Sequence, residues 1–153
     1  GGPPIIIGGG GKRVLTAAAQ QADIVGLNAS LHAGSVGPET ALSALGERFL
    51  ERRNWVEEAA GDRFAQIELQ MNTFMTAVTS STSEAEEMFN GMAPMFGLTA
   101  EQAKTIPMVL AGTVNDVCEQ LERYRDQYGT SYWVIHDGEI ETMAPVVAKL
   151  AGS

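Results

Sequence analysis

The sequence predicts an α/β fold with a parallel sheet built from four strand–helix units. Short apolar runs at residues 5–7, 22–28, 67–74 and 132–135 indicate strands, and each is followed by a segment with helical periodicity. The spacing of the units resembles that of a (β/α)8 TIM-type barrel, which needs about 250 residues for eight units. Two architectures are possible, and the uniform order of the units together with a polar row on the third strand favours about half of a (β/α)8 barrel. Half of such a barrel places strand neighbours in sequential order, whereas a small open doubly wound sheet places the first strand in the middle.

The first strand and the glycines after it predict an anion-binding turn. Ile5–Ile7 lie between two prolines and Gly8–Gly11, which is typical of a strand buried on both faces. The glycines permit backbone conformations closed to other residues, and a helix follows. The first amides of that helix lack partners and its dipole favours an anion. Lys12 and Arg13 either add charge at the rim or are solvated surface cations. Four glycines fit neither known phosphate-loop spacing, so a turn that binds nothing is the alternative.

Composition limits the class of protein and its partners. At 153 residues and 44% hydrophobic, the chain suits one core, so we expect a single domain over residues 1–153. A formal net charge of −9 opposes the basic surface that nucleic-acid binding requires. The single cysteine and the lack of a long apolar run predict a cytoplasmic protein with no membrane partner. Because Gly1 precedes a strand so closely, we expect the chain to be a fragment.

The third predicted strand, residues 67–74, alternates between apolar and polar side chains. The apolar row is Ile67, Leu69 and Met71, and the polar row is Glu68, Gln70 and Asn72. Helices that cover a sheet need apolar partners, so the polar row is expected to face the interior of a barrel. Asn72 then lies near the carboxyl end of its strand, where barrel enzymes place their chemistry. An edge strand with one solvated face explains the same alternation in an open sheet.

The segments between the strands have recognisable helix signals. Residues 29–38, which include His32, predict a loop at the carboxyl ends of the strands. A single apolar stripe from Leu42 to Ala60 predicts one helix, and Arg52 does not belong to this stripe. Residues 83–107 predict an insertion-like helical segment, rich in methionine and capable of packing on another subunit, with capping boxes that begin at Ser83 and Thr99. Residues 108–112 predict a packed loop, and residues 113–129 predict a helix with a buried Cys118.

Two polar side chains are candidates for contact with a substrate. His136 directly follows the fourth strand, so we expect it, with Asn72, to face a substrate at the carboxyl edge of the sheet. A surface histidine bonded to a neighbour is the alternative. Two histidines and one cysteine that lie far apart in the sequence predict neither a metal site nor a nucleophile–base pair.

Several segments together resemble the luciferase-like monooxygenase superfamily, and most of all its oxidoreductases that use the deazaflavin coenzyme F-420. The similar segments, in order, are residues 4–15, 22–26, 58–64 leading into 67–69, 97–99, 110–113 and 144–152. Members of the family are (β/α)8 barrels roughly twice this length, and the sequence resembles only their carboxyl-terminal half. The resemblance therefore implies a partner for the open strand edges, either the missing amino-terminal half or a second copy in a homo-oligomer.

The same resemblance implies a cofactor, a reaction and a set of binding residues. The cofactor is coenzyme F-420 or FMN, and the reaction is hydride transfer with a small organic substrate or, with FMN, its oxygenation. The residues implied to bind the cofactor are Gly8, Gly9, Gly10, Gly11 and, at the end of the next strand, Asn28. Family residues that handle protons lie largely in the other half, so no catalytic residue is assigned and the chain alone is expected to be inactive. A non-catalytic half barrel that self-associates and binds an anion is the rival interpretation.

Overall fold

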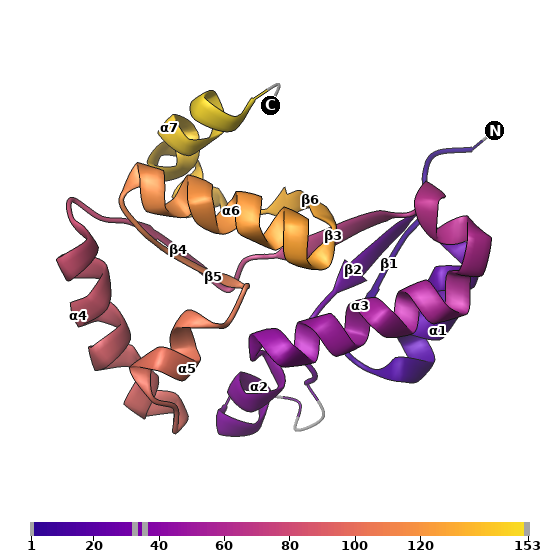
Figure 1. The fold of residues 1–153 in the computed structure, drawn as a ribbon, viewed down its shortest axis with the longest axis horizontal. Coiled ribbons are helices and arrows are strands. Elements are labelled where there is room, and N and C mark those ends of the chain that lie inside the picture. The colour runs from indigo at the N-terminus through magenta and orange to yellow at the C-terminus, as the bar shows by residue number, and fades with distance from the viewer. Residues whose placement is uncertain (1, 32–33, 35–36, 152–153) are drawn as a thin grey trace.

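A computed structural model describes residues 2–31, 34 and 37–151, and its main feature is a parallel sheet with sequential strand order (Figure 1). The strands, in spatial order, are β1 (Ile6–Gly9), β2 (Ile24–Leu27), β3 (Glu68–Asn72) and β6 (Thr130–Val134). Every neighbouring pair is parallel. With the first strand at an edge and the units in sequential order, the sheet has the topology of a half barrel. A doubly wound sheet would place β1 in the middle.

A second, smaller sheet corrects the prediction for residues 108–112. After Thr73 and Phe74, the chain continues from β3 into β4 (Met75–Val78), which pairs in parallel with β5 (Val109–Gly112). All four residues of β5 are buried. The segment is therefore a strand and not the packed loop expected. The edge of β4 offers backbone partners that satisfy the polar groups of this short apolar run.

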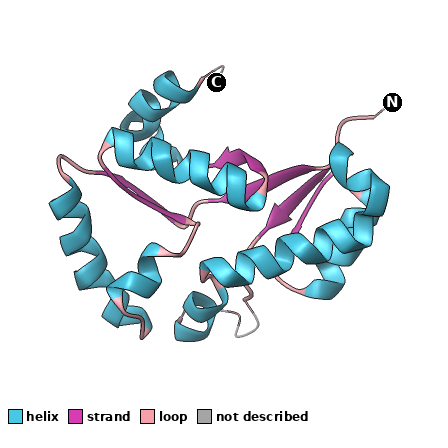
Figure 2. Ribbon diagram, in the orientation of Figure 1, coloured by secondary structure: helices cyan, strands magenta, loops and turns pink. Residues whose placement is uncertain are grey.

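The helices connect the strands and lie mainly on one side of the main sheet. Their bounds are α1 Lys12–Gln21, α2 Pro38–Ser43, α3 Gly46–Ala60, α4 Thr82–Met92, α5 Ala100–Lys104, α6 Val114–Tyr128 and α7 Ile140–Leu150, with short 3-10 turns η1 Gly61–Gln66, η2 Ala93–Phe96 and η3 Asp137–Glu139. Helices α1, α3 and α6 cover one face of the main sheet (Figure 2). Within these described segments, no helix is long and apolar enough to cross a membrane.

The two faces of the main sheet differ sharply in exposure. On the face that the helices cover, Val25, Leu27 and Met71 are fully buried. On the opposite face, Tyr132 is 40% exposed and Val134 is 39% exposed. Strand register places these two residues beside Gln70 and Asn72, so the polar row of β3 does face away from the helix layer.

This uncovered face overturns the prediction that the first strand is buried on both sides. Ile5 and Ile6 are 55% and 51% exposed, and Ile7 is half-buried. The physical reason is that β1 is an edge strand and that only one face of the sheet carries a helix layer. An apolar strand at this place suits a barrel whose remaining strands would cover it.

Local signals at helix ends are confirmed at some positions and wrong at others. The hydroxyl of Thr99 accepts from the Gln102 amide as predicted, and Gly129, with φ of 75°, ends α6. The cap of α4 is Ser81, not Ser83, because its hydroxyl accepts from the Glu84 amide at 3.2 Å. The predicted helix over residues 42–60 is two helices, α2 and α3, which meet at a break after residue 43.

Candidate functional site

A cavity of about 500 Å³ lies at the carboxyl ends of β1, β2 and β3. Gly9 lines it from the end of β1 and Gly10 from just after it, Asn28 directly follows β2, and Asn72 is the last residue of β3. The structure therefore brings four predicted site residues together around one space. The opposite wall comes from α2, η2, α5 and the segment before β5.

Beside this cavity, the amino terminus of α1 has unpartnered amides. Gly11 is the residue before the helix, and no side chain caps the helix there. The first amide bonded within the helix is that of Leu15, which donates to the Gly11 carbonyl at 3.1 Å. No acidic residue occupies the first turn. The amides of residues 12–14 can therefore donate to an anion, which the helix dipole also favours.

The glycines of the turn serve close packing and not the unusual backbone conformations expected of them. None of Gly8 to Gly11 has a positive φ. A Cβ atom at Gly10 would lie 2.6 Å from the Ala29 carbonyl oxygen, and one at Gly8 would lie 2.9 Å from Nδ2 of Asn28. At Gly11 a Cβ atom would meet nothing within 4 Å. Gly10 is thus required for the turn to pack against β2, whereas Gly11 faces open space.

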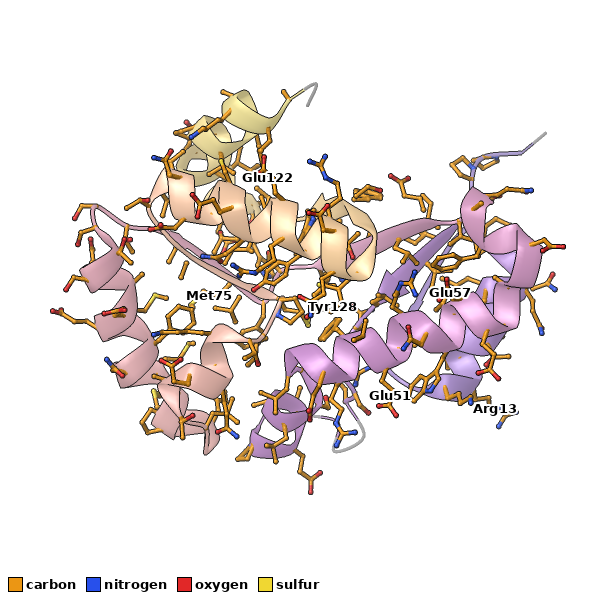
Figure 3. The ribbon with its side chains drawn as sticks, viewed as in Figure 1. Arg13, Glu51, Glu57, Met75, Glu122 and Tyr128 are labelled. Atoms are coloured by element: carbon orange, nitrogen blue, oxygen red, sulfur yellow. The ribbon has the colours of Figure 1, made fainter. Side chains whose placement is uncertain are left out.

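The two cations after the turn do not converge on it. Lys12 Nζ lies 3.8 Å from Glu58 Oε2 and 6.0 Å from the centre of the Trp55 ring, and both of these partners belong to α3. Arg13 is exposed and extends from the outer side of α1 (Figure 3). The side chains of Lys12 and Arg13 therefore do not form a rim of positive charge around the turn. Backbone amides are the main hydrogen-bond donors available to an anion there.

A buried arginine beneath the turn is a feature that sequence reasoning missed. Arg52 is 4% exposed, and its Nε donates to the Gly10 carbonyl at 2.9 Å while its Nη1 donates to the Ser43 carbonyl at 2.7 Å. Burial lowers the pKa of the Arg52 guanidinium from its ordinary value. The residue holds Gly10 and α2 in place. Its spacing of three and four residues from Phe49 and Val56, both fully buried, is the signal that places it on the inner face of α3.

Amide side chains form the polar edge of the cavity. Gln70 is 3% exposed, and its Nε2 donates to Asn72 Oδ1 at 2.6 Å. A Cβ atom at Gly26 would lie 2.7 Å from Gln70 Oε1, so this glycine makes room for the glutamine. The role of Gln70 was not predicted from the sequence. With its oxygen engaged, Asn72 presents its NH2 group as the remaining donor.

His136 lies outside the cavity, where it begins the turn η3. Its amide donates to Glu139 Oε2 at 3.2 Å, and the other oxygen of Glu139 accepts from the Thr76 amide at 2.8 Å. Burial raises the pKa of Glu139, but hydrogen bonds from Thr76 and His136 outweigh it, and the net pKa is lowered. In this structure the histidine backbone helps join β6 to β4. His32 lies outside the described residues.

Comparison with solved structures defines the fold. The sequence matches no family model and no curated protein. The long-chain alkane monooxygenase LadA aligns with a TM-score of 0.61 at 14% identity, over 97% of this chain and 41% of that one. The coenzyme F-420 dependent tetrahydromethanopterin reductase from Methanopyrus kandleri aligns with a TM-score of 0.60 at 16% identity, over 95% of this chain and 49% of that one.

A riboflavin lyase, RcaE, solved with modified FMN and riboflavin, aligns with a TM-score of 0.59 at 10% identity, over 96% of this chain and 43% of that one. The chain has the fold of about half of each of these enzymes. It spans less than half the length of each of these three solved chains. The half-barrel architecture that the sequence pattern favoured is thereby confirmed.

The chemistry available in this half barrel is binding and orientation. Backbone amides, Asn28 and Asn72 supply hydrogen bonds, and apolar side chains supply the walls. The described residues that line the cavity include no charged side chain and no histidine, cysteine or tyrosine. Elsewhere in the described segments, no group of three or more histidine, cysteine and acidic side chains is arranged to hold a metal ion. This cavity wall therefore offers no group suited to accept or donate a proton near neutral pH.

Proposed function

We propose that this chain is the cofactor-binding half of a flavin- or deazaflavin-dependent oxidoreductase. The observation that carries the proposal is the uncapped amino terminus of α1 directly beside an apolar cavity at the carboxyl edge of the sheet. A phosphate suits the first feature, and a flat organic ring suits the second. Two of the aligned structures are an F-420 dependent reductase and a riboflavin lyase solved with modified FMN, which supports the same class of cofactor.

The residues present fit such a group. Coenzyme F-420 or FMN supplies the hydride-transfer chemistry when it is bound. The amides of residues 12–14 bind its phosphate, and Arg52 fixes the Gly10 carbonyl so that the turn keeps its place. Asn28 and Asn72 orient the polar edge of the ring, while the apolar wall excludes water and accepts a small organic substrate.

Proton transfer and cover for the open face of the sheet require a second polypeptide segment in this proposal. Because no proton-transferring side chain lines the described cavity, we propose that an amino-terminal half barrel supplies these groups and covers the open face of the sheet. The isolated chain should then bind cofactor but turn over no substrate.

Gly11 allows a test that leaves the fold intact. A side chain there meets nothing within 4 Å, and the backbone, with φ of −113°, is extended. Gly11→Asp places a carboxylate where it caps the helix itself and repels an anion. Titration of FMN and of coenzyme F-420 by isothermal calorimetry should show binding weakened at least about tenfold by Gly11→Asp. The Gly11→Ala control should bind like the unmodified chain.

The thermal unfolding temperature separates loss of binding from loss of fold. We expect Gly11→Asp to be at least as stable as Gly11→Ala, because an aspartate is a favourable helix cap. Equal cofactor affinity in both variants would reject the phosphate site at α1. Robust hydride transfer by the purified chain alone would reject the division of labour between two halves.

A non-catalytic half barrel is the second candidate, and the exposed face of the sheet favours it. Ile6, Tyr132 and Val134 offer an apolar surface through which two copies can associate. In this second case, the amino terminus of α1 binds simple inorganic anions such as phosphate. Binding of inorganic phosphate as tight as that of FMN and coenzyme F-420 would favour this second function over the first.

A further inference from the structure

We propose that a second cavity, bounded by helices α6 and α7 and strand β6, binds an uncharged molecule with a compact apolar body and one hydroxyl group. This α6–α7 cavity has a volume of about 580 Å³, within the range of about 300–1,000 Å³ that is usual for small-molecule sites. It shares no lining residue with the cavity at the carboxyl edge of the sheet. The inference therefore goes beyond the proposed function and does not depend on it.

The walls of the α6–α7 cavity are mainly apolar. Helix α7 packs beside α6 (Figure 1), and its residues Met143 and Val146, which line the cavity, are 3% and 1% exposed. Trp133 of β6 and Leu121 of α6 also line it but are only half-buried. A ligand with an apolar body would remove the remaining exposed surface of these two side chains from water.

A buried hydroxyl group without a partner determines the polar group of the ligand. Thr130, the first residue of β6, lines the cavity and is 0% exposed. Its Oγ1 has no hydrogen-bond partner among the described residues. Such a group destabilises a folded chain unless something bonds to it. A ligand hydroxyl suits this role, because it can donate to the Thr130 oxygen or accept from it.

The charged side chains of this cavity favour an uncharged ligand. Among the described residues that line it, only Glu122 and Arg125 are charged. Both are exposed on α6, they carry opposite charges, and solvent screens them. The deeper walls carry no charge, so an ionised ligand would lose hydration without gaining a net counter-charge.

Three adamantanes of nearly identical shape test this ligand class. Adamantanol, methyladamantane and adamantylammonium carry a hydroxyl, a methyl and a charged group at the same bridgehead carbon. The chain has two tryptophans, so Trp55→Phe leaves Trp133 alone, and its fluorescence reports binding in the α6–α7 cavity. We expect the alcohol to bind at least about fivefold more tightly than the hydrocarbon. It should bind at least about tenfold more tightly than the ammonium.

Substitution of Thr130 separates the effect of its hydroxyl from that of its shape. Thr130→Val removes the hydroxyl, so the alcohol should lose its advantage over the hydrocarbon. Because the unpartnered group is gone, the free variant should also unfold at a higher urea concentration than the unmodified chain. Thr130→Ser keeps the hydroxyl and should keep the preference for the alcohol. Thr142→Val, at an exposed position of α7, is the control and should change neither property.

Two positions on α7 with nearly equal exposure locate the binding. Val147 lines the cavity and is 58% exposed, whereas Ile140 does not line it and is 57% exposed. Val147→Asp should weaken binding of the alcohol at least about tenfold, because it places a charge on the apolar wall. Ile140→Asp should leave the affinity unchanged. Gly11→Asp should also leave it unchanged, which keeps this test separate from that of the cofactor site.

Three results would overturn the inference whatever the outcome with the cofactors. They are equal affinities for the alcohol and the hydrocarbon, equal affinities in the Val147 and Ile140 variants, and a Thr130→Val variant less stable than the unmodified chain. Unchanged Trp133 fluorescence with all three probes would overturn it as well. If sedimentation velocity then showed self-association that Val147→Asp abolishes and Ile140→Asp does not, the cavity would belong to a contact with a second copy.

Discussion

The two faces of the main sheet are formed by the same four strands, but helices cover only one of them. On one face, Val25 of β2 and Met71 of β3 are fully buried beneath the helices. On the other, Ile6 at one edge is 51% exposed and Tyr132 on the opposite edge strand is 40% exposed. The covered face is packed like the hydrophobic core of a complete domain. The open face resembles the inward-facing side of barrel strands, which carries no helix layer.

The difference teaches where stability and function are located in this chain. Burial of apolar surface on the covered face supplies the main driving force for folding. The open face carries instead the small glycines and amide side chains that lead to the cavity at its carboxyl edge. One face supplies the packed core of the chain, and the other leads to the cavity at the carboxyl edge of the sheet.

The largest effect is expected at the buried arginine on the covered side. Arg52→Leu removes two hydrogen bonds and leaves the Gly10 and Ser43 carbonyls without these partners, which should cost about 3 kcal/mol of unfolding free energy. Arg48→Leu is the control on the same helix, because the Arg48 side chain is 54% exposed and forms only surface ion pairs. That change should cost less than about 1 kcal/mol. Urea denaturation measures both, and equal losses would show that Arg52 does not support the turn.

The next largest effect is the difference in unfolding free energy between alanine substitutions of two valines, one on each face of the sheet. Val25→Ala creates a cavity on the covered face, where the residue is 0% exposed, and should cost about 2 kcal/mol. Val134→Ala changes the open face, where the residue is 39% exposed, and should cost less than about 1 kcal/mol. The same denaturation measurement applies. Similar losses would mean that the open face is already covered in solution.

The smallest effect concerns association through the open face. If two copies meet there, Ile6→Lys should weaken self-association about tenfold, because a lysine would be buried without a partner. Sedimentation velocity over a range of concentrations measures the change. Met95→Lys, at another exposed apolar position, is the control and should leave association unchanged. A well-behaved monomer at all concentrations would contradict self-association through this face.

Much of the fold could be predicted because its signals are local. Short apolar runs predicted the strands of the main sheet, and Thr99, Thr113 and Gly129 marked helix ends as expected. The alternation along β3 predicted its open face. The exposure of Ile6 and the pairing of Val109–Gly112 could not be predicted in the same way, since each depends on which neighbour the rest of the chain provides.

For the site, the sequence by itself determined the glycine turn, the strand ends with their asparagines, and the parallel class of sheet. These follow from backbone stereochemistry and side-chain periodicity within a few residues. Only the tertiary structure decided that Gly10 is needed for contact with Ala29, that Arg52 is buried beneath the turn, and that residues 83–107 close an apolar cavity. Those features join segments distant along the chain, and packing in three dimensions is what brings them within contact distance.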